Sequence, residues 1–245
     1  IIISQWNEDP FITSLPDTYS NMKKLERFFP IVDHSFITTN PSVLKIPKKN
    51  IPYIHFFMTP VDKNIECFDV FKLKPQNDVF YAMSHGVNRA TLKEGKTDDR
   101  VKFLDQLINK INGIKYDFYG FGKQEPVWGN EFYRSLLNSK MALNLSRGHP
   151  IKHYSSNRIA SLMGNGLMVF IDQRVKMNNF FNSDEIVSYN NINDLAEKIK
   201  FYKKNDKSRI KIAKKGKEKY FKLFNEVKIA KYIIDNSLGN KVSLI

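Results

Sequence analysis

Cysteine is almost absent, since the 245-residue chain has a single thiol, Cys67. One cysteine excludes a disulfide scaffold and a cysteine zinc site, and it is typical of a reducing compartment. No apolar run approaches the roughly 18 residues of a membrane-spanning helix. The apolar residues 1–3 lack both a starting Met and a basic flank, so they do not have the pattern of a signal peptide. We expect residues 1–6 to form a buried strand entered midway, in a fragment of a longer protein.

Several motifs of catalytic sites are absent as well. The chain has no Walker loop, no Gly-x-Ser-x-Gly, no Gly-x-Gly-x-x-Gly and no Asp-x-Asp. These absences disfavour a nucleophilic enzyme, a dinucleotide fingerprint and a metal-bridged nucleotide-sugar site. His149 and His153 have the i, i+4 spacing of some metal ligands, but Pro150 between them disfavours a helix. We therefore expect no metal site.

Acidic residues are few, because 25 Asp and Glu stand against 39 Lys and Arg, a formal net charge of +14. Residues 198–231 hold 14 basic residues and only three acidic ones. Such a segment can bind an anionic membrane surface, although a solvated helix face in a Lys-rich protein explains it slightly better. We do not expect nucleic acid as a partner, because no zinc finger, RNP-type strand or GxxG clamp accompanies the charge.

Strand-like and helix-like segments alternate over nearly the whole chain, which predicts an α/β fold around parallel sheets. The short apolar segments expected to be strands are 1–6, 35–39, 53–57, 79–84, 116–120, 141–145, 167–171 and 185–189. The segments expected to be helices are 98–111, 131–137, 157–163, 193–202, 207–224 and 226–236.

A stretch without a clear period, residues 62–77, separates two parts of this pattern. We expect residues 1–61 to be the end of one α/β domain and residues 78–224 to be a second domain. The last helix and the tail, residues 225–245, are expected to cross back to the first domain.

The strongest signal of a binding site lies in residues 154–172, and the loop that leaves the strand 141–145 adds to it. Ligands of open α/β sheets bind at the carboxyl ends of the strands, where this loop places Arg147 and Lys152. The next helix begins at Ser156, Asn157 and Arg158, and a helix N-terminus beside an Arg suits a phosphate or diphosphate. An ordinary capped helix is the alternative, and the spacing alone favours it.

Two further strand ends carry glycine with a basic residue. Gly86 and Arg89 follow the strand 79–84, and Gly120 and Gly122 follow the strand 116–120. Three such strand ends in one domain indicate a phosphorylated ligand.

Two acidic residues, Glu8 and Asp9, follow the first strand. Either could act as a general base if burial raised its pKa. The alternative is a turn that Asp9 starts at Pro10, with Glu8 exposed.

Residues 142–220 resemble the C-terminal, donor-binding domain of GT-B glycosyltransferases of the "glycosyl transferases group 1" type, especially the branch of spore-maturation-like proteins. The matching features are the pair Asn157-Arg158 that opens a helix, Gly166 behind it, an apolar strand ending in Asp172, the segments 178–181, 185–189 and 194–199, and a basic helix 210–220 that contains Gly216. The stretches 6–10 and 36–40 also resemble the last part of that branch's N-terminal domain.

This resemblance implies two Rossmann-like domains with parallel sheets, the N-terminal one incomplete. It implies metal-independent transfer, without a cofactor, from a nucleotide-diphosphate sugar to a glycan or lipid-linked acceptor of cell-envelope polysaccharide synthesis. The protein is then expected in the cytoplasm or peripherally at the inner face of the membrane. Ser161 stands where many members have the Glu that holds the donor ribose. The expected donor-binding residues are Gly86, Arg89, Gly120, Gly122, Arg147, Lys152, Tyr154, Ser156, Asn157, Arg158 and Ser161.

Other functions fit the same residues. A sugar-nucleotide epimerase shares the two-domain architecture, and a non-catalytic module could dock at a membrane through residues 198–231. Because acceptor binding, and often the base, belong to the N-terminal domain in this family, the resemblance also implies that the chain alone can lack activity.

Overall fold

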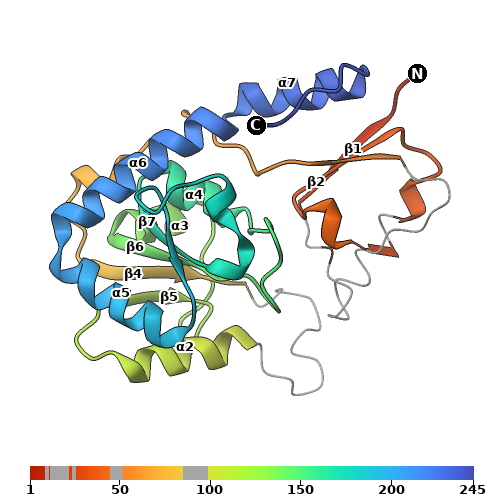
Figure 1. Ribbon diagram of the computed structural model, residues 1–245. Coiled ribbons are helices and arrows are strands. Elements are labelled where there is room, and N and C mark those ends of the chain that lie inside the picture. Colours follow the sequence, from red (N-terminus) through yellow and green to blue (C-terminus); the bar gives the residue numbers. More distant parts are fainter. Residues whose placement is uncertain (9–10, 12–21, 24–25, 45–51, 85–98) are drawn as a thin grey trace.

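The computed structural model describes residues 1–8, 11, 22–23, 26–44, 52–84 and 99–245, and Figure 1 shows two parallel sheets flanked by helices. The small sheet has the strand order β1 (Ser4–Asn7), β2 (His34–Ile37) and β3 (Tyr53–Phe56). The large sheet has the order β5 (Tyr116–Tyr119), β4 (Asn77–Ala82), β6 (Ser139–Asn144), β7 (Met168–Asp172) and β8 (Val187–Tyr189). All paired strands run parallel, so the chain has the expected α/β fold.

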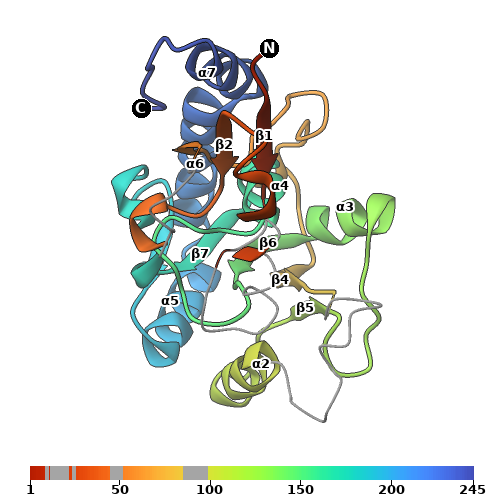
Figure 2. The same cartoon turned by 90° about the vertical axis from the view of Figure 1, so that its right-hand side faces the viewer.

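Helices cover both faces of the large sheet (Figure 1, Figure 2). On one face, α2 (Asp99–Lys110) and α5 (Ile192–Lys204) pack on alternate residues of β4 such as Val79 and Tyr81. On the other face, α3 (Gly129–Leu137), α4 (Arg158–Gly164) and α6 (Asp206–Phe224) pack on the intervening residues Phe80 and Ala82. Strands covered on both faces are continuously apolar, which is why the sequence predicts them as short unbroken runs.

The expected strands and helices all have counterparts, but residues 1–3 differ from the prediction. The strand begins at Ser4, and Ile1, Ile2 and Ile3 are exposed rather than buried. The backbone of Ile3 is hydrogen bonded to Asp33, yet β1 is an edge strand whose one neighbour in the described sheet is β2. No described layer covers these three side chains.

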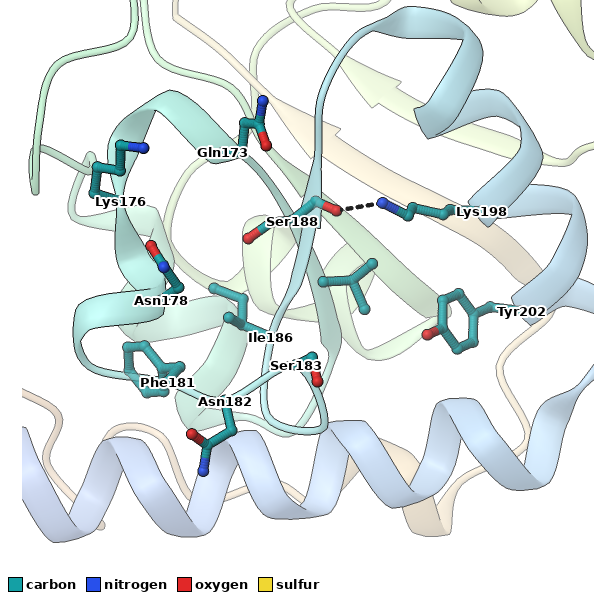
Figure 3. Close-up of a pocket in the computed structure, with 11 residues that line it drawn as sticks. Gln173, Lys176, Asn178, Phe181, Asn182, Ser183, Ile186, Ser188, Lys198 and Tyr202 are labelled. Carbon is teal, nitrogen blue, oxygen red and sulfur yellow. Dashed lines mark hydrogen bonds between the residues drawn. The ribbon is translucent and has the colours of Figure 1, made fainter.

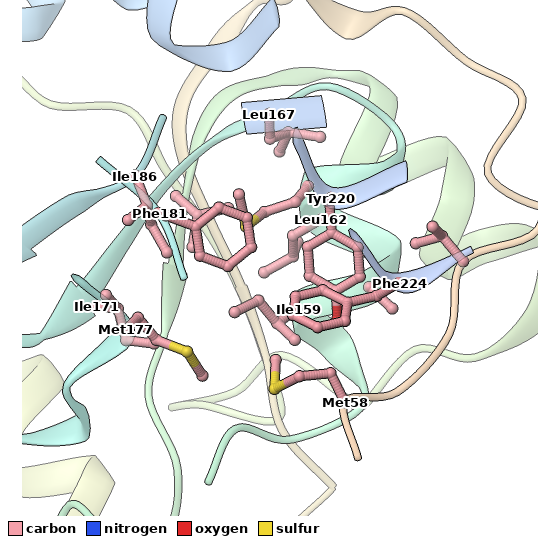
Figure 4. Packing of buried hydrophobic residues seen from close by; sticks show 14 of the residues in the cluster. Met58, Ile159, Leu162, Leu167, Ile171, Met177, Phe181, Ile186, Tyr220 and Phe224 are labelled. Atoms are coloured by element: carbon pink, nitrogen blue, oxygen red, sulfur yellow. The ribbon is translucent and has the colours of Figure 1, made fainter. Parts of the chain in front are cut away.

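The segment after β3 packs tightly against α4 and α6 of the large sheet. Met58 joins a core cluster with Ile159 of α4 and Phe224 of α6, as Figure 4 shows. The backbone of Val61 donates to Phe224 O over 3.0 Å, and that of Val70, in a short 3-10 helix (Val70–Lys72), donates to Asn165 O over 3.0 Å. The stretch 62–77 is therefore ordered against α4 and α6, while the division into domains stays a prediction.

The last helix, α7 (Glu226–Ser237), reaches the small sheet. The ring of Tyr232 lies edge-on to those of Phe36 and His55, at 5.9 Å and 6.3 Å between centroids. The hydroxyls of Ser4 and Ser237 are hydrogen bonded over 2.7 Å. Figure 1 shows α7 beside β1 accordingly.

None of the described helices combines the length and apolar composition that crossing a membrane requires.

Candidate functional site

The loop between β6 and α4, residues 145–157, is folded back onto the strand that it leaves. The buried amide of Asn144, the last residue of β6, donates to Ser155 Oγ over 2.9 Å. Its oxygen accepts a hydrogen bond from Ser156 Oγ over 3.3 Å. Ser156, an expected donor-binding residue, thus holds the loop in place at the carboxyl end of the sheet.

Arg158 lies at the same end of the sheet. Its guanidinium is 5.4 Å from the ring centroid of Tyr81 and donates to Leu145 O over 2.9 Å. Tyr81 donates to the same carbonyl over 3.0 Å. The Nε of Arg158 is buried and has no hydrogen-bond partner among the described residues. Tyr81 of β4 and the Leu145 carbonyl, which follows β6, therefore fix this cation at the carboxyl ends of the two strands.

A hollow of about 170 Å³ lies beside the Arg158 side chain. It is lined by Ala82, Met83, Ser84, Pro126, Val127, Trp128, Phe132 and Arg158. Trp128 is 57% exposed, so a ligand can reach its ring. Aromatic and apolar walls with one cation beside them suit a flat ring that is joined to an anionic group.

The glycines at the strand ends have different roles. Gly120 has φ +69°, and a Cβ there would collide with the Met83 carbonyl, where β4 and β5 approach closely. Gly122 has φ +62° and faces open space. Gly120 is thus explained by backbone packing. Gly86 and Arg89 lie outside the described residues.

The start of α4 differs from the expected anion site. The helix has only seven residues, and the side chain of Asn157 makes no capping hydrogen bond. The N–H groups of Ile159 and Ala160 are already used, by Ser156 O at 3.0 Å and Asn157 O at 3.1 Å. A tight first turn therefore uses these two amides, which the sequence predicts to be open, and the guanidinium of Arg158 is the positive group at this point.

Asn157 instead connects the two sheets. Its amide nitrogen donates to the carboxylate of Glu8, and its oxygen accepts from Thr59 Oγ1 over 3.4 Å. Glu8 follows β1 directly, and its carbonyl accepts from Thr38 Oγ1 over 3.1 Å. The structure thus brings a half-buried carboxylate to the residue before Arg158. Asp9 lies outside the described residues.

The other expected donor-binding residues lie in the same loop or in α4. Arg147 and Lys152 are half-buried within it, and Tyr154 is buried at a small second hollow beside Asn144. Ser161, in α4, interacts with the side chain of Tyr133 of α3.

Sequence reasoning missed the part that His153 plays. The side chain is 7% exposed, and its ring nitrogens contact the amides of Asn40 at 2.7 Å and Asn179 at 3.0 Å. Burial, with Lys152 nearby, lowers the pKa of His153 to about 4. Asn40 follows β2, so the strand-end argument applied to the small sheet could have indicated it.

A larger hollow of about 350 Å³ lies beyond the edge strand β8, and Figure 3 shows its lining. Gln173, Asn178 and Ser188 contribute polar groups, and Lys198 donates to Ser188 O over 2.7 Å. None of the expected site residues lines this hollow.

Comparisons with known proteins fit this architecture. The family model described as glycosyl transferase-like matches residues 99–235, more than half of the chain. No curated protein matches the chain.

Three solved structures have the same fold. TarM matches with a TM-score of 0.58 at 13% identity, over 96% of this chain and 49% of TarM. A sucrose-phosphate synthase from Thermosynechococcus elongatus matches with a TM-score of 0.60 at 12% identity, over 94% of this chain and 65% of that one. An alpha-glucosyltransferase in complex with UDP-glucose and DNA containing an abasic site matches with a TM-score of 0.60 at 14% identity. The match covers 97% of this chain and 72% of that one.

The chain spans 49% and 65% of the length of the first two structures. At such identities the likeness shows the fold alone, and that fold is GT-B. The match of the family model adds the family. The chain belongs to the glycosyl transferase-like family and has the GT-B architecture of glycosyltransferases.

Proposed function

We propose that the protein transfers a hexose from a nucleotide-diphosphate sugar to a hydroxyl of a glycan or lipid-linked acceptor. Membership of the family supports sugar transfer in general. The observation that carries the choice of donor is the Arg158 guanidinium, held on Tyr81 beside an aromatic hollow. A fixed cation next to apolar walls matches a ligand that joins a flat base to an anionic diphosphate.

In this proposal the nucleobase occupies the hollow beside Trp128, and the diphosphate lies against Arg158. Arg147 and Lys152, on the same loop, add positive charge. When the sugar leaves, negative charge develops on the diphosphate, and cations already held in place stabilise it without reorganisation. We also predict that Arg89 and Gly86 bind the donor, as the sequence indicates.

These cations also support a reaction that needs no metal ion. Metal ions at nucleotide-sugar sites neutralise the leaving diphosphate, and Arg158, Arg147 and Lys152 offer the same compensation from the protein. A transfer rate that persists in the presence of a chelator is the corresponding expectation.

Glu8 is the proposed base for the acceptor hydroxyl. A carboxylate can take the proton while the hydroxyl oxygen attacks the anomeric carbon and the bond to the diphosphate breaks. The hydrogen bond from Asn157 holds this carboxylate at the residue before Arg158, on the side of the small sheet.

A thermal-shift panel with UDP, GDP, ADP, CDP and dTDP tests the proposed function. A ligand held only by the folded state stabilises it, by about 2.7 kcal/mol at a hundred times its Kd. We expect at least one of the five to raise the melting temperature of the chain, and the corresponding nucleoside to raise it less. A panel in which none raises the melting temperature would contradict the proposal.

Work at an anionic membrane surface is a further part of the proposal. Lys207, Lys211 and Lys214 are exposed on α6, and the apolar side chains of Val227 and Ile234 are exposed on α7. We expect sedimentation with vesicles containing phosphatidylserine at low salt, release at high salt, and weaker binding by the double variant Lys207→Glu, Lys211→Glu. Equal binding to neutral vesicles would overturn this part.

A further inference from the structure

His153 lies in the loop that carries Arg147 and Lys152, yet it faces the small sheet. Its ring is 5.5 Å from that of Phe56, in β3, and 4.6 Å from that of Phe180, between centroids. With only 7% of the residue exposed, the imidazole is enclosed by residues from both parts of the chain.

The hydrogen bonds of His153 select one tautomer. Asn40 Oδ1 already accepts from the Ser42 N–H over 2.9 Å, so the Asn40 amide presents its nitrogen to His153 Nδ1 at 2.7 Å. Nδ1 therefore accepts, and a neutral ring must carry its proton on Nε2. The atom 3.0 Å from Nε2 is Asn179 Nδ2, and turning this amide by 180° gives the Nε2 proton an oxygen to which it donates. The lowered pKa of His153 agrees with a ring that stays neutral.

The backbone around His153 is held in an uncommon conformation. His153 has φ +61°, and its N–H donates over 2.7 Å to Val175 O, next to Lys176 at φ +59°. Side-chain-bearing residues keep such left-handed conformations only where their surroundings hold them, and they concentrate at functional sites.

The loop contacts the small sheet at two points. His153 bonds Asn40, and Asn157 bonds Glu8, while Glu8 itself is bonded to Thr38. Asn40 and Thr38 both follow β2 closely. The contact of His153 thus lies at the same corner as the proposed base.

We propose that His153 is a positioning residue that holds the loop 145–157 against the small sheet, so that Arg158 and Glu8 keep their relative placement during transfer. This inference rests on the proposed function. Arg158 is fixed by Tyr81 and Leu145 within the large sheet, so donor binding survives without His153, whereas the placement of the donor relative to the base and acceptor does not.

The test uses His153→Gln, Asn40→Ser and the double variant. Serine can still cap the Ser42 N–H but is too short to reach the imidazole. His149→Gln, at an exposed histidine of the same loop, is the matched control. The readouts are the Kd of the nucleoside diphosphate that stabilises the wild type most, and kcat/KM for the acceptor.

We expect His153→Gln and Asn40→Ser each to lower kcat/KM for the acceptor at least tenfold while the nucleotide Kd changes less than twofold. The double variant should lose no more than the worse single variant, and His149→Gln should lose nothing. Equal losses of nucleotide affinity and transfer, or multiplied losses in the double variant, would overturn the inference. If His153→Gln does not fold, Asn40→Ser alone tests the inference, by the same comparison of kcat/KM for the acceptor with the nucleotide Kd.

A second measurement distinguishes a failure of the proposed function from a failure of this inference. If the wild type binds none of the five nucleoside diphosphates, the coupling of Asn40 and His153 is measured from the unfolding free energies of the same variants. If the losses of unfolding free energy in the two single variants do not add up in the double variant, Asn40 and His153 are coupled and their contact holds the two sheets together. Additive losses overturn this contact.

Discussion

The Nε of Arg158 is a buried donor that no described residue satisfies, although Nη2 of the same side chain donates to Leu145 O and the guanidinium lies over the Tyr81 ring. A buried donor without a partner costs free energy that a ligand can recover. The sequence predicts Arg158 as a site residue because it follows a strand and opens a helix. It does not predict Tyr81 as its partner, because that contact depends on β4 and β6 being neighbours.

At the same scale, Glu8→Gln tests the proposed base. The amide keeps the size of the side chain and a hydrogen-bonding oxygen, but it cannot take a proton. We expect kcat to fall about 100-fold, the low end of general-base contributions, while the Kd of the nucleotide stays unchanged. Steady-state kinetics with calorimetry would measure both, and Glu218→Gln, exposed on α6, is the control. A kcat within threefold of the wild type would exclude Glu8 as the base.

Among the secondary-structure elements, β4 is anchored near its first residue by an ionic cluster. Asp78 is 2% exposed and accepts from Lys115 N–H at 3.0 Å, Lys203 Nζ at 2.6 Å and Lys140 Nζ at 3.2 Å. Burial raises the pKa of Asp78, but these donors together outweigh it and hold the pKa below its usual value. One carboxylate thereby ties β4 to β6 and α5.

Replacing Asp78 by Ala should cost about 3 kcal/mol of unfolding free energy at pH 7, since it leaves two lysines facing a buried gap. A carboxylate with a lowered pKa stabilises the fold above its unfolded pKa of about 3.9, and this contribution is lost as the pH falls through the lower folded value. Urea unfolding should therefore show a large difference at pH 7 that shrinks in strong acid. Glu197→Ala, in an exposed pair with Lys200, should cost less than about 1 kcal/mol.

The elements themselves are predictable to a large extent, and the exceptions have physical causes. The period of apolar residues predicts α2, because Leu104, Leu107 and Ile111 pack on one face of the large sheet. The capping of α4 is not predictable from residue types, because Asn157 uses its side chain for Glu8, far away in sequence. The prediction that residues 1–3 are buried is wrong for a similar reason. Their apolar composition alone does not determine whether another layer of the structure covers them.

For the whole molecule, histidines lie where the small sheet meets its neighbours. His34 Nδ1 is 3.0 Å from His55 Nε2, and His55 packs on Tyr232 of α7. Burial, and then the proximity of His34, lower the pKa of His55. His153 has its pKa lowered to about 4. Both side chains are thus neutral in the folded chain under conditions where unfolded histidine takes up a proton.

The unfolding free energy should therefore be constant above about pH 6.5 and fall as the pH drops below it, because the unfolded chain binds protons first. His153 alone accounts for at most about 3 kcal/mol by pH 4, because a tenfold difference in proton affinity between the folded and unfolded chain is worth about 1.4 kcal/mol. Chemical denaturation at pH 7 and pH 5 would measure this slope, and His153→Gln should flatten it. A stability that rises toward pH 5 would contradict the account.

Contacts between residues far apart in the sequence are the part of the whole structure that the sequence does not predict. The alternation of strands and helices predicts two parallel sheets, and strand ends predict where a ligand binds. The pairing of Asn40 with His153, 113 residues apart, and of Glu8 with Asn157, 149 residues apart, depends on how the two sheets face each other. No local period carries that information.

A calorimetric titration of the wild type and of Arg158→Ala with the best-binding nucleoside diphosphate addresses the central idea most directly. Arg134→Ala, at an exposed arginine of α3, removes the same charge away from the hollow. We expect the Kd to rise more than tenfold for Arg158→Ala and to stay within twofold for Arg134→Ala. The same affinity in wild type and Arg158→Ala would contradict a diphosphate site built around this guanidinium.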